Sequence, residues 1–188
     1  MSPEKVIGTQ MFADPRHSHV VLINLSRGET PISAGLAARH SSFSLLHTGL
    51  EMFAVPLTVI GECQPAGIDV RQQLTQSMMQ LDVDPLSIWR DRRFTDNLAS
   101  AQTGIIFYGG SWLEEEIFIA ALQTAERGYD VRLLSDLTAA RVDRDRSLVL
   151  SRLALHGILP TTVRQMLLEW AVCLDDALLK QKVQQLLL

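Results

Sequence analysis

The sequence is poor in cysteine and in aromatic residues, and neither sign of charge dominates. The only two cysteines, Cys63 and Cys173, lie far apart and do not have the spacing of metal ligands. We therefore predict two reduced thiols, no metal site, no cofactor and a cytoplasmic location. The net charge of −4 gives no electrostatic reason to expect nucleic acid or an anionic membrane as a partner.

Long apolar runs are also missing. No stretch of about 18 uninterrupted apolar residues occurs, which is the length that a membrane-spanning helix needs. The first residues lack the continuous apolar run of a signal peptide. The chain has 188 residues, of which 47% are hydrophobic, and this is enough for a full hydrophobic core. We predict a single domain over residues 1–188.

Short apolar runs alternate with segments of helical periodicity. The runs typical of buried strands are 17–25, 55–62, 104–110 and 129–136. Weaker strands are expected at 85–89 and, at an edge of the sheet, at 158–162. Helices are expected at 32–54, 67–81, 94–102, 113–127, 143–157 and 162–188. This alternation predicts a three-layer α/β/α fold with a mainly parallel sheet of about five or six strands.

One turn and helix need a functional explanation. The stretch 109–131 begins with a glycine turn, and the first turn of the helix that follows carries Glu114, Glu115 and Glu116. A helix N-terminus favours bound anions and can activate a nucleophile. This one carries three carboxylates and no cysteine.

The region around this turn resembles the isochorismatase-like cysteine hydrolase superfamily, and in particular its YcaC-like branch. The segment "IIFYGGSWLEEEIFIAALQTAERGYDVRLLSDLTAA" follows the order of that superfamily without a gap: strand, glycine, turn, nucleophile, helix, glycine-tyrosine, strand and aspartate. "RLALHGILPTTVRQMLLEWA" is similar to the end of the branch, and "VVLINLSRG" and "LEMFAVPLTVIGE" are similar to its first half. The resemblance covers nearly the whole chain. It implies the isochorismatase-like hydrolase fold and a homo-oligomer.

The superfamily uses a nucleophilic cysteine, a basic aspartate and an orienting lysine. In this sequence the matching positions hold Glu116 for the cysteine, Asn24 for the aspartate, and Trp89 or Arg90 for the lysine. A carboxylate is a much weaker nucleophile than a thiolate, and a neutral amide has almost no basicity. The resemblance therefore implies a site in which all three catalytic residue types are replaced.

Other residues near this site have more ordinary interpretations. Ser111, Trp112 and Leu113 are expected to line the old active-site pocket. Glu114 and Glu115 suit a helix N-terminus electrostatically, and Asp136 is interpreted as a structural capping residue. The charged run at 141–147 is interpreted as a solvated helical turn.

Three hypotheses about function follow. The first is a non-catalytic pseudoenzyme that acts by binding or assembly. The alternative is an enzyme with reworked chemistry, in which Glu116 and a nearby arginine act on a small molecule. Arg90, Arg92 and Arg93 are the candidates for that arginine. The third is a small-ligand sensor that has kept the old pocket and lost turnover. The apolar terminal helix, which ends in "VQQLLL", predicts that the chain forms a homo-oligomer through this helix.

Overall fold

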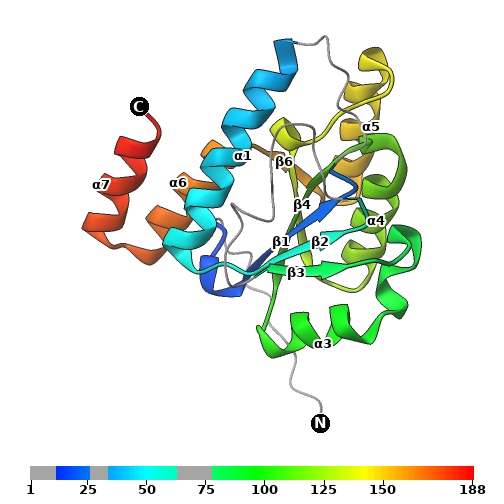
Figure 1. The fold of residues 1–188 in the computed structure, drawn as a ribbon, viewed down its shortest axis with the longest axis horizontal. Coiled ribbons are helices and arrows are strands. Elements are labelled where there is room, and N and C mark those ends of the chain that lie inside the picture. The colour runs from blue at the N-terminus through cyan, green and yellow to red at the C-terminus, as the bar shows by residue number, and fades with distance from the viewer. Residues whose placement is uncertain (1–11, 26–33, 63–77) are drawn as a thin grey trace.

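A six-stranded parallel sheet lies at the centre of the molecule (Figure 1). The computed structural model describes residues 12–25, 34–62 and 78–188, with the backbone alone for 34–38. The strands are β1 (Ser18–Ile23), β2 (Leu57–Ile60), β3 (Met78–Leu81), β4 (Ile105–Gly110), β5 (Asp130–Leu134) and β6 (Leu159–Thr161). Their order in the sheet is β3-β2-β1-β4-β5-β6. The four strands predicted with most support are neighbours in one parallel sheet, which confirms the predicted fold class.

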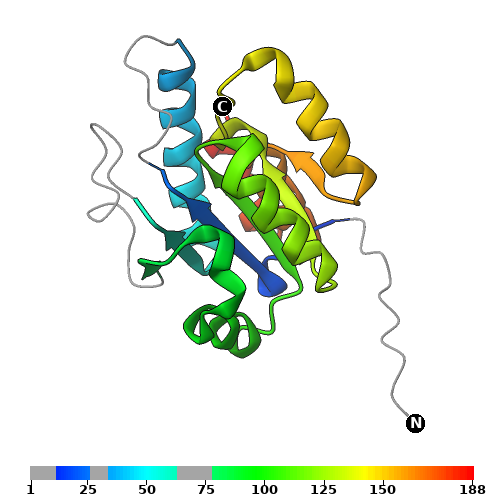
Figure 2. The ribbon, with the colours of Figure 1, turned by 90° about the vertical axis from the view of Figure 1, so that its right-hand side faces the viewer.

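Helices cover both faces of the sheet, as Figure 2 shows from the side. On one face, Val20 and Leu22 of β1 pack in a cluster with residues of α1 (Ala34–Phe53) and α6 (Val163–Leu174). On the other face, Val21 and Ile23 pack in a second cluster. That cluster includes residues of α3 (Arg92–Ser100), α4 (Phe118–Glu126) and α5 (Asp143–Leu155). Every residue of β1 is therefore buried, which explains the continuous apolar run at 20–23 in this strand.

Two of the predicted elements around β3 are wrong. Met78–Leu81 forms an edge strand, although the sequence pattern predicts the end of a helix there; the rest of that predicted helix lies outside the described residues. The predicted strand at 85–89 is the 3-10 helix η2 (Pro85–Arg90). The Asp84 side chain accepts a hydrogen bond from the Leu86 amide, and Pro85 occupies the first turn. Both features favour a helix start.

The predicted terminal helix is two helices, α6 and α7 (Ala177–Leu186), which lie side by side in Figure 1. The chain turns at Asp175, which has a left-handed backbone conformation, and the Asp176 side chain caps α7 by accepting from the amides of Leu178 and Leu179. Val183 of α7 is fully buried. The apolar end of the chain therefore packs against its own domain.

Among the helices in the described ranges, none is both long enough and apolar enough to cross a membrane.

Candidate active site

The carboxyl ends of β1, β2 and β4 meet at one edge of the sheet, and the candidate site lies there. Asn24 follows β1, Gly61 follows β2 and Ser111 follows β4. The Asn24 amide donates to the Ile60 carbonyl at 2.9 Å, and the Ser111 amide donates to the Ile23 carbonyl at 3.0 Å. In open parallel α/β sheets this edge is where ligand sites form.

Two glycines allow the chain segments at this edge to approach closely. Gly61 has a φ of +72°, and a Cβ there would lie 2.2 Å from Oδ1 of Asn24. Gly110 has a φ of +136°, and a Cβ there would lie 2.0 Å from the Ile23 carbonyl oxygen. Both positions combine a backbone conformation that favours glycine with a space that a side chain would fill.

Asn24 is held firmly in a buried position. Its side chain accepts a hydrogen bond at Oδ1 from the Glu62 amide, at 3.1 Å. Its Nδ2 donates to Oε1 of Glu116 at 3.2 Å. The residue is 2% exposed and has a φ of +47°, a conformation that asparagine tolerates better than most residues. The two positions that the resemblance assigns to base and nucleophile are therefore in direct contact.

The segment that carries Glu116 is not a regular helix. Leu113–Ile117 forms a wide π-type turn, Glu115 has non-helical dihedral angles (φ −113°, ψ −112°), and α4 begins only at Phe118. Helical turns of this type occur frequently at functional sites. The expected regular helix from 113 therefore starts one turn later, and the three glutamates belong to the irregular turn before it.

The expected pocket residues differ in their surroundings. Leu113 is fully buried in the hydrophobic cluster on the α4 face, so its side chain belongs to the core. Ser111 is 1% exposed, and its carbonyl accepts from the Ala139 amide at 2.9 Å. Trp112 is half-buried and lies beneath the guanidinium of Arg141.

The arginines that contact the segment 110–115, which leads to Glu116, are not those suggested by the sequence. Arg39 of α1 is buried, and its Nη2 donates to the Gly110 carbonyl at 2.5 Å. Arg141, from the loop after β5, pairs with Glu115. Arg39 was not predicted from the sequence, and Arg141 was expected in a solvated helical turn. No sequence signal separates either residue from the other arginines of the chain.

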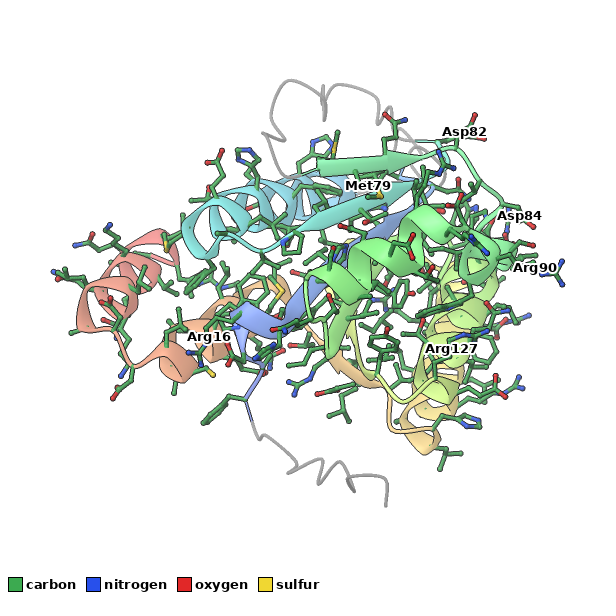
Figure 3. All side chains as sticks on the ribbon, turned by 90° about the horizontal axis from the view of Figure 1, so that it is seen from below. Arg16, Met79, Asp82, Asp84, Arg90 and Arg127 are labelled. Atoms are coloured by element: carbon green, nitrogen blue, oxygen red, sulfur yellow. The ribbon has the colours of Figure 1, made fainter. Side chains whose placement is uncertain are left out.

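The three arginines that were expected here lie elsewhere. Arg93 pairs with Asp91 at 2.6 Å, and Arg92 is exposed. Arg90 points outward at the rim of the molecule (Figure 3).

Trp89 also lies away from Asn24. Its ring contacts Phe94 and Tyr129, with centroid distances of 5.3 and 5.5 Å, and the Arg127 guanidinium lies 4.7 Å from its ring centroid. Tyr129 directly precedes β5, so these contacts are at the opposite edge of the sheet from Asn24. The structure thus brings Asn24 and Glu116 together and leaves Trp89 apart from them.

No described lysine takes the orienting role at this edge. The whole sequence has three lysines, Lys5, Lys180 and Lys182. Lys180 and Lys182 belong to α7, where Lys180 pairs with Asp175, and Lys5 lies outside the described residues.

Asp136 makes a structural contact, as expected from the sequence, and this contact is with α6. Its carboxylate accepts from the Val163 amide at 3.1 and 3.2 Å, at the N-terminus of α6. In the part of the chain that the structure describes, no group of three potential ligands could hold a metal ion.

Comparison with known proteins finds solved structures that share this fold. No protein-family model matches the sequence. No curated protein matches it either. Among solved structures, MAR1 ribonuclease from Caenorhabditis elegans is similar at a TM-score of 0.77 and 17% identity, covering 93% of this chain and 91% of that one. The YcaC gene product of Escherichia coli, described as an octameric hydrolase of unknown specificity, has a TM-score of 0.72 and 17% identity, with 93% and 90% coverage.

A pyrazinamidase from Pyrococcus horikoshii, solved in complex with zinc, is similar in fold as well. Its TM-score is 0.62 at 12% identity, and the match covers 78% of this chain and 99% of that one. An isochorismatase from Pseudomonas putida also matches, with a TM-score of 0.58. The chain has the isochorismatase-like hydrolase fold, with its six parallel strands and helices on both faces.

Proposed function

We propose that the chain is an isochorismatase-like protein that has lost hydrolysis and acts by binding or assembly. One observation carries this proposal: Asn24 Nδ2 donates to Glu116 Oε1 at the two positions where the resemblance places base and nucleophile. An asparagine amide does not accept a proton near neutral pH. A carboxylate attacks amide carbons far less readily than a thiolate does. Loss of one member of a catalytic triad already costs several orders of magnitude in rate.

The test is an assay of hydrolysis by the purified wild-type chain. The substrates to try follow from structural neighbours that are named as a nicotinamidase, a pyrazinamidase, an isochorismatase, an N-carbamoylsarcosine amidase and a ribonuclease. They are nicotinamide, pyrazinamide, isochorismate, N-carbamoylsarcosine and a short RNA. We expect no release of product above the buffer blank from any of them. Saturable turnover that disappears in Glu116→Ala would overturn the proposal.

A second candidate function is an enzyme with reworked acid–base chemistry. The observation in its favour is the buried Arg39, which donates to Gly110 in the turn that leads to Glu116. In this alternative, Glu116 exchanges a proton with a small molecule, and Arg39 or Arg141 stabilises negative charge on it. The same assay separates the two functions, because only the second predicts turnover that depends on Glu116.

The assembly part of the proposal concerns the outer side of the C-terminal helices. Leu168 and Val172 lie one turn apart on α6 and are 43% and 46% exposed, and Leu178 of α7 is 69% exposed. Exposed apolar side chains on a small domain favour burial by another subunit. The neighbour from E. coli is described as octameric. We propose a homo-oligomer that uses this surface.

A further inference from the structure

The loop after β5 lies directly on the segment that carries Glu116. Ala139 in this loop pairs with Trp112 as an isolated parallel bridge. The Ala139 amide donates to the Ser111 carbonyl at 2.9 Å, and the Leu113 amide donates to the Ala139 carbonyl at 2.8 Å. The loop therefore follows the turn at 111–115 through backbone contacts on both sides of Trp112.

Arg141 adds three contacts from the end of the same loop. Its backbone amide donates to Oε1 of Glu114 at 2.6 Å. Its guanidinium donates through Nε and Nη2 to both carboxylate oxygens of Glu115, with 3.2 Å between Nη2 and Oε2. The guanidinium carbon also lies 4.6 Å from the ring centroid of Trp112, a cation–π arrangement. One arginine thus contacts three of the four residues that precede Glu116.

The two ends of the loop are anchored differently. Arg146 of α5 donates to the Thr138 carbonyl at 3.1 Å and also to the Ser135 carbonyl, and its side chain is partly buried. The contact of Arg141 with Glu115 is open to solvent, since these side chains are 54% and 37% exposed. Salt weakens exposed ion pairs much more than buried ones. The Arg141 end of the loop is therefore the end that can separate from the 112–116 turn.

Glu115 connects these contacts to the candidate site. It is the residue with non-helical dihedral angles, and Glu116 follows it directly. Because Arg141 fixes Glu114 and Glu115, it also fixes the direction in which the Glu116 side chain points. That direction leads to Nδ2 of Asn24. The hydrogen bond to Glu115 raises the pKa of Arg141, and the charge of Glu116 acts on it in the same direction.

We propose that Arg141 is a positioning residue: its contacts fix the 112–116 turn and keep Glu116 in contact with Asn24. Loss of the contacts of the Arg141 side chain, by substitution or at high ionic strength, separates the Glu116 and Asn24 side chains. The inference deepens the proposed function because it names what controls the Asn24–Glu116 contact. It concerns the geometry of that contact and does not depend on whether the chain hydrolyses anything.

The test measures solvent exchange of the Asn24 side-chain amide protons by NMR, in the wild-type chain and in Arg141→Gln. We expect exchange to increase by about two- to fivefold, the range that corresponds to losing an exposed ion pair. Fluorotryptophan labelling should show a shifted signal for Trp112 and unchanged signals for Trp89 and Trp170. Sodium chloride added to the wild-type chain should move both observables in the same direction.

Arg127→Gln is the matched control, because Arg127 lies over Trp89 at a similar distance of 4.7 Å. It should shift the Trp89 signal and leave Asn24 exchange unchanged. Glu115→Gln removes the same ion pair by changing the other partner. This variant replaces Arg141→Gln in the test if Arg141→Gln fails to fold. Asn24 exchange that stays at the wild-type rate in the folded variants and at high salt would overturn the proposal. Turnover in the hydrolysis assay would contradict the proposed loss of hydrolysis but not the positioning role of Arg141.

Discussion

At the scale of single residues, the candidate site depends on backbone conformations that few side chains allow. Gly110 has a positive φ, and its Cα faces the backbone of β1. A side chain on this residue would separate β4 from β1 at the point where Ser111 bonds to Ile23. The close approach of these two strands is what brings the turn with Glu116 over Asn24.

Gly110→Ala should therefore destabilise the protein, by about 2–4 kcal/mol, because positive-φ strain adds to a clash with backbone atoms. Urea unfolding followed by circular dichroism measures this change. Gly104→Ala is the control, since a Cβ there meets nothing within 4 Å. Similar unfolding midpoints for the two variants would contradict the role given to Gly110.

The contribution of the buried residue His19 to the stability of the folded chain depends on pH. It is fully buried on β1, and its Nε2 lies 2.8 Å from the Thr58 hydroxyl. Burial lowers the pKa of His19 from 6.5 to about 4. Because the folded-state pKa is the lower one, the unfolded chain takes up a proton first as the pH falls. The associated stability is present above pH ~6.5 and is lost progressively toward pH ~4.

As the pH falls from 7 to 5, we expect the lowered pKa of His19 to reduce the free energy of unfolding of the wild-type chain by about 2 kcal/mol. His19→Gln should remove that part of the pH dependence. Chemical denaturation at several pH values provides the measurement, with His156→Gln, at an exposed position, as the control. Identical pH profiles for wild type and His19→Gln would rule out this role of His19.

At the scale of elements, one ion pair joins α6 to the sheet and to the start of the described chain. Arg132 of β5 is 6% exposed, and its Nη1 donates to Oε2 of Glu169 at 2.6 Å. The same oxygen accepts from the Ala13 amide at 3.1 Å. Asp130 is a second, more exposed partner of Arg132 at 3.2 Å. One carboxylate of α6 thus satisfies a buried cation and a backbone donor.

Glu169→Ala should lower the free energy of unfolding by about 1–3 kcal/mol, because it leaves a buried guanidinium with a poorer set of partners. Lys180→Ala removes an ion pair with Asp175, in which the aspartate is 87% exposed, and should cost under about 1 kcal/mol. Denaturant midpoints of the two variants measure the difference. Equal costs would contradict the structural role of Glu169.

The elements also show how far sequence reasoning can go. β1, β2, β4 and β5 were predictable because each is a buried apolar run between turns. β3 was not, since Met78–Leu81 lies at an edge, is only partly buried and has no β-branched residue. The break at Asp175 was missed because the apolar spacing continues across it, and a left-handed aspartate leaves no distinct pattern.

The candidate site was predictable only where a motif extends over it. The spacing within the motif placed Glu116 and Asn24, and these two residues meet in the structure. Arg39 and Arg141 reach the site from α1 and from the loop after β5, more than 20 residues away from the residues that they contact. Such contacts depend on the packing of distant segments, which a single sequence does not encode in any local spacing.

At the scale of the whole molecule, the exposed leucine and valine of α6 bear on assembly. Leu168→Glu with Val172→Glu should shift an oligomer toward smaller species, because two charges would have to be buried in the interface. Leu155→Glu, on an 86% exposed leucine of α5, is the control for charge alone. Light scattering at micromolar concentration measures the mass. A monomeric wild-type chain would contradict the proposed homo-oligomer.

Truncation of the tail would be a poorer test of assembly. Leu186 and Leu187 are partly buried against the chain's own hydrophobic cluster, so their removal would disturb the domain itself. The surface substitutions on α6 avoid that problem.

The central claim is that the Asn24–Glu116 contact has replaced a nucleophile and its base. Initial rates of the wild-type chain and of Glu116→Gln test it most directly. Glutamine keeps a side-chain oxygen that can accept from Asn24 but removes the charge and the capacity to take up a proton. We predict that both proteins match the buffer blank for every substrate of the panel. A wild-type rate that saturates with substrate and falls to the blank in Glu116→Gln would contradict it.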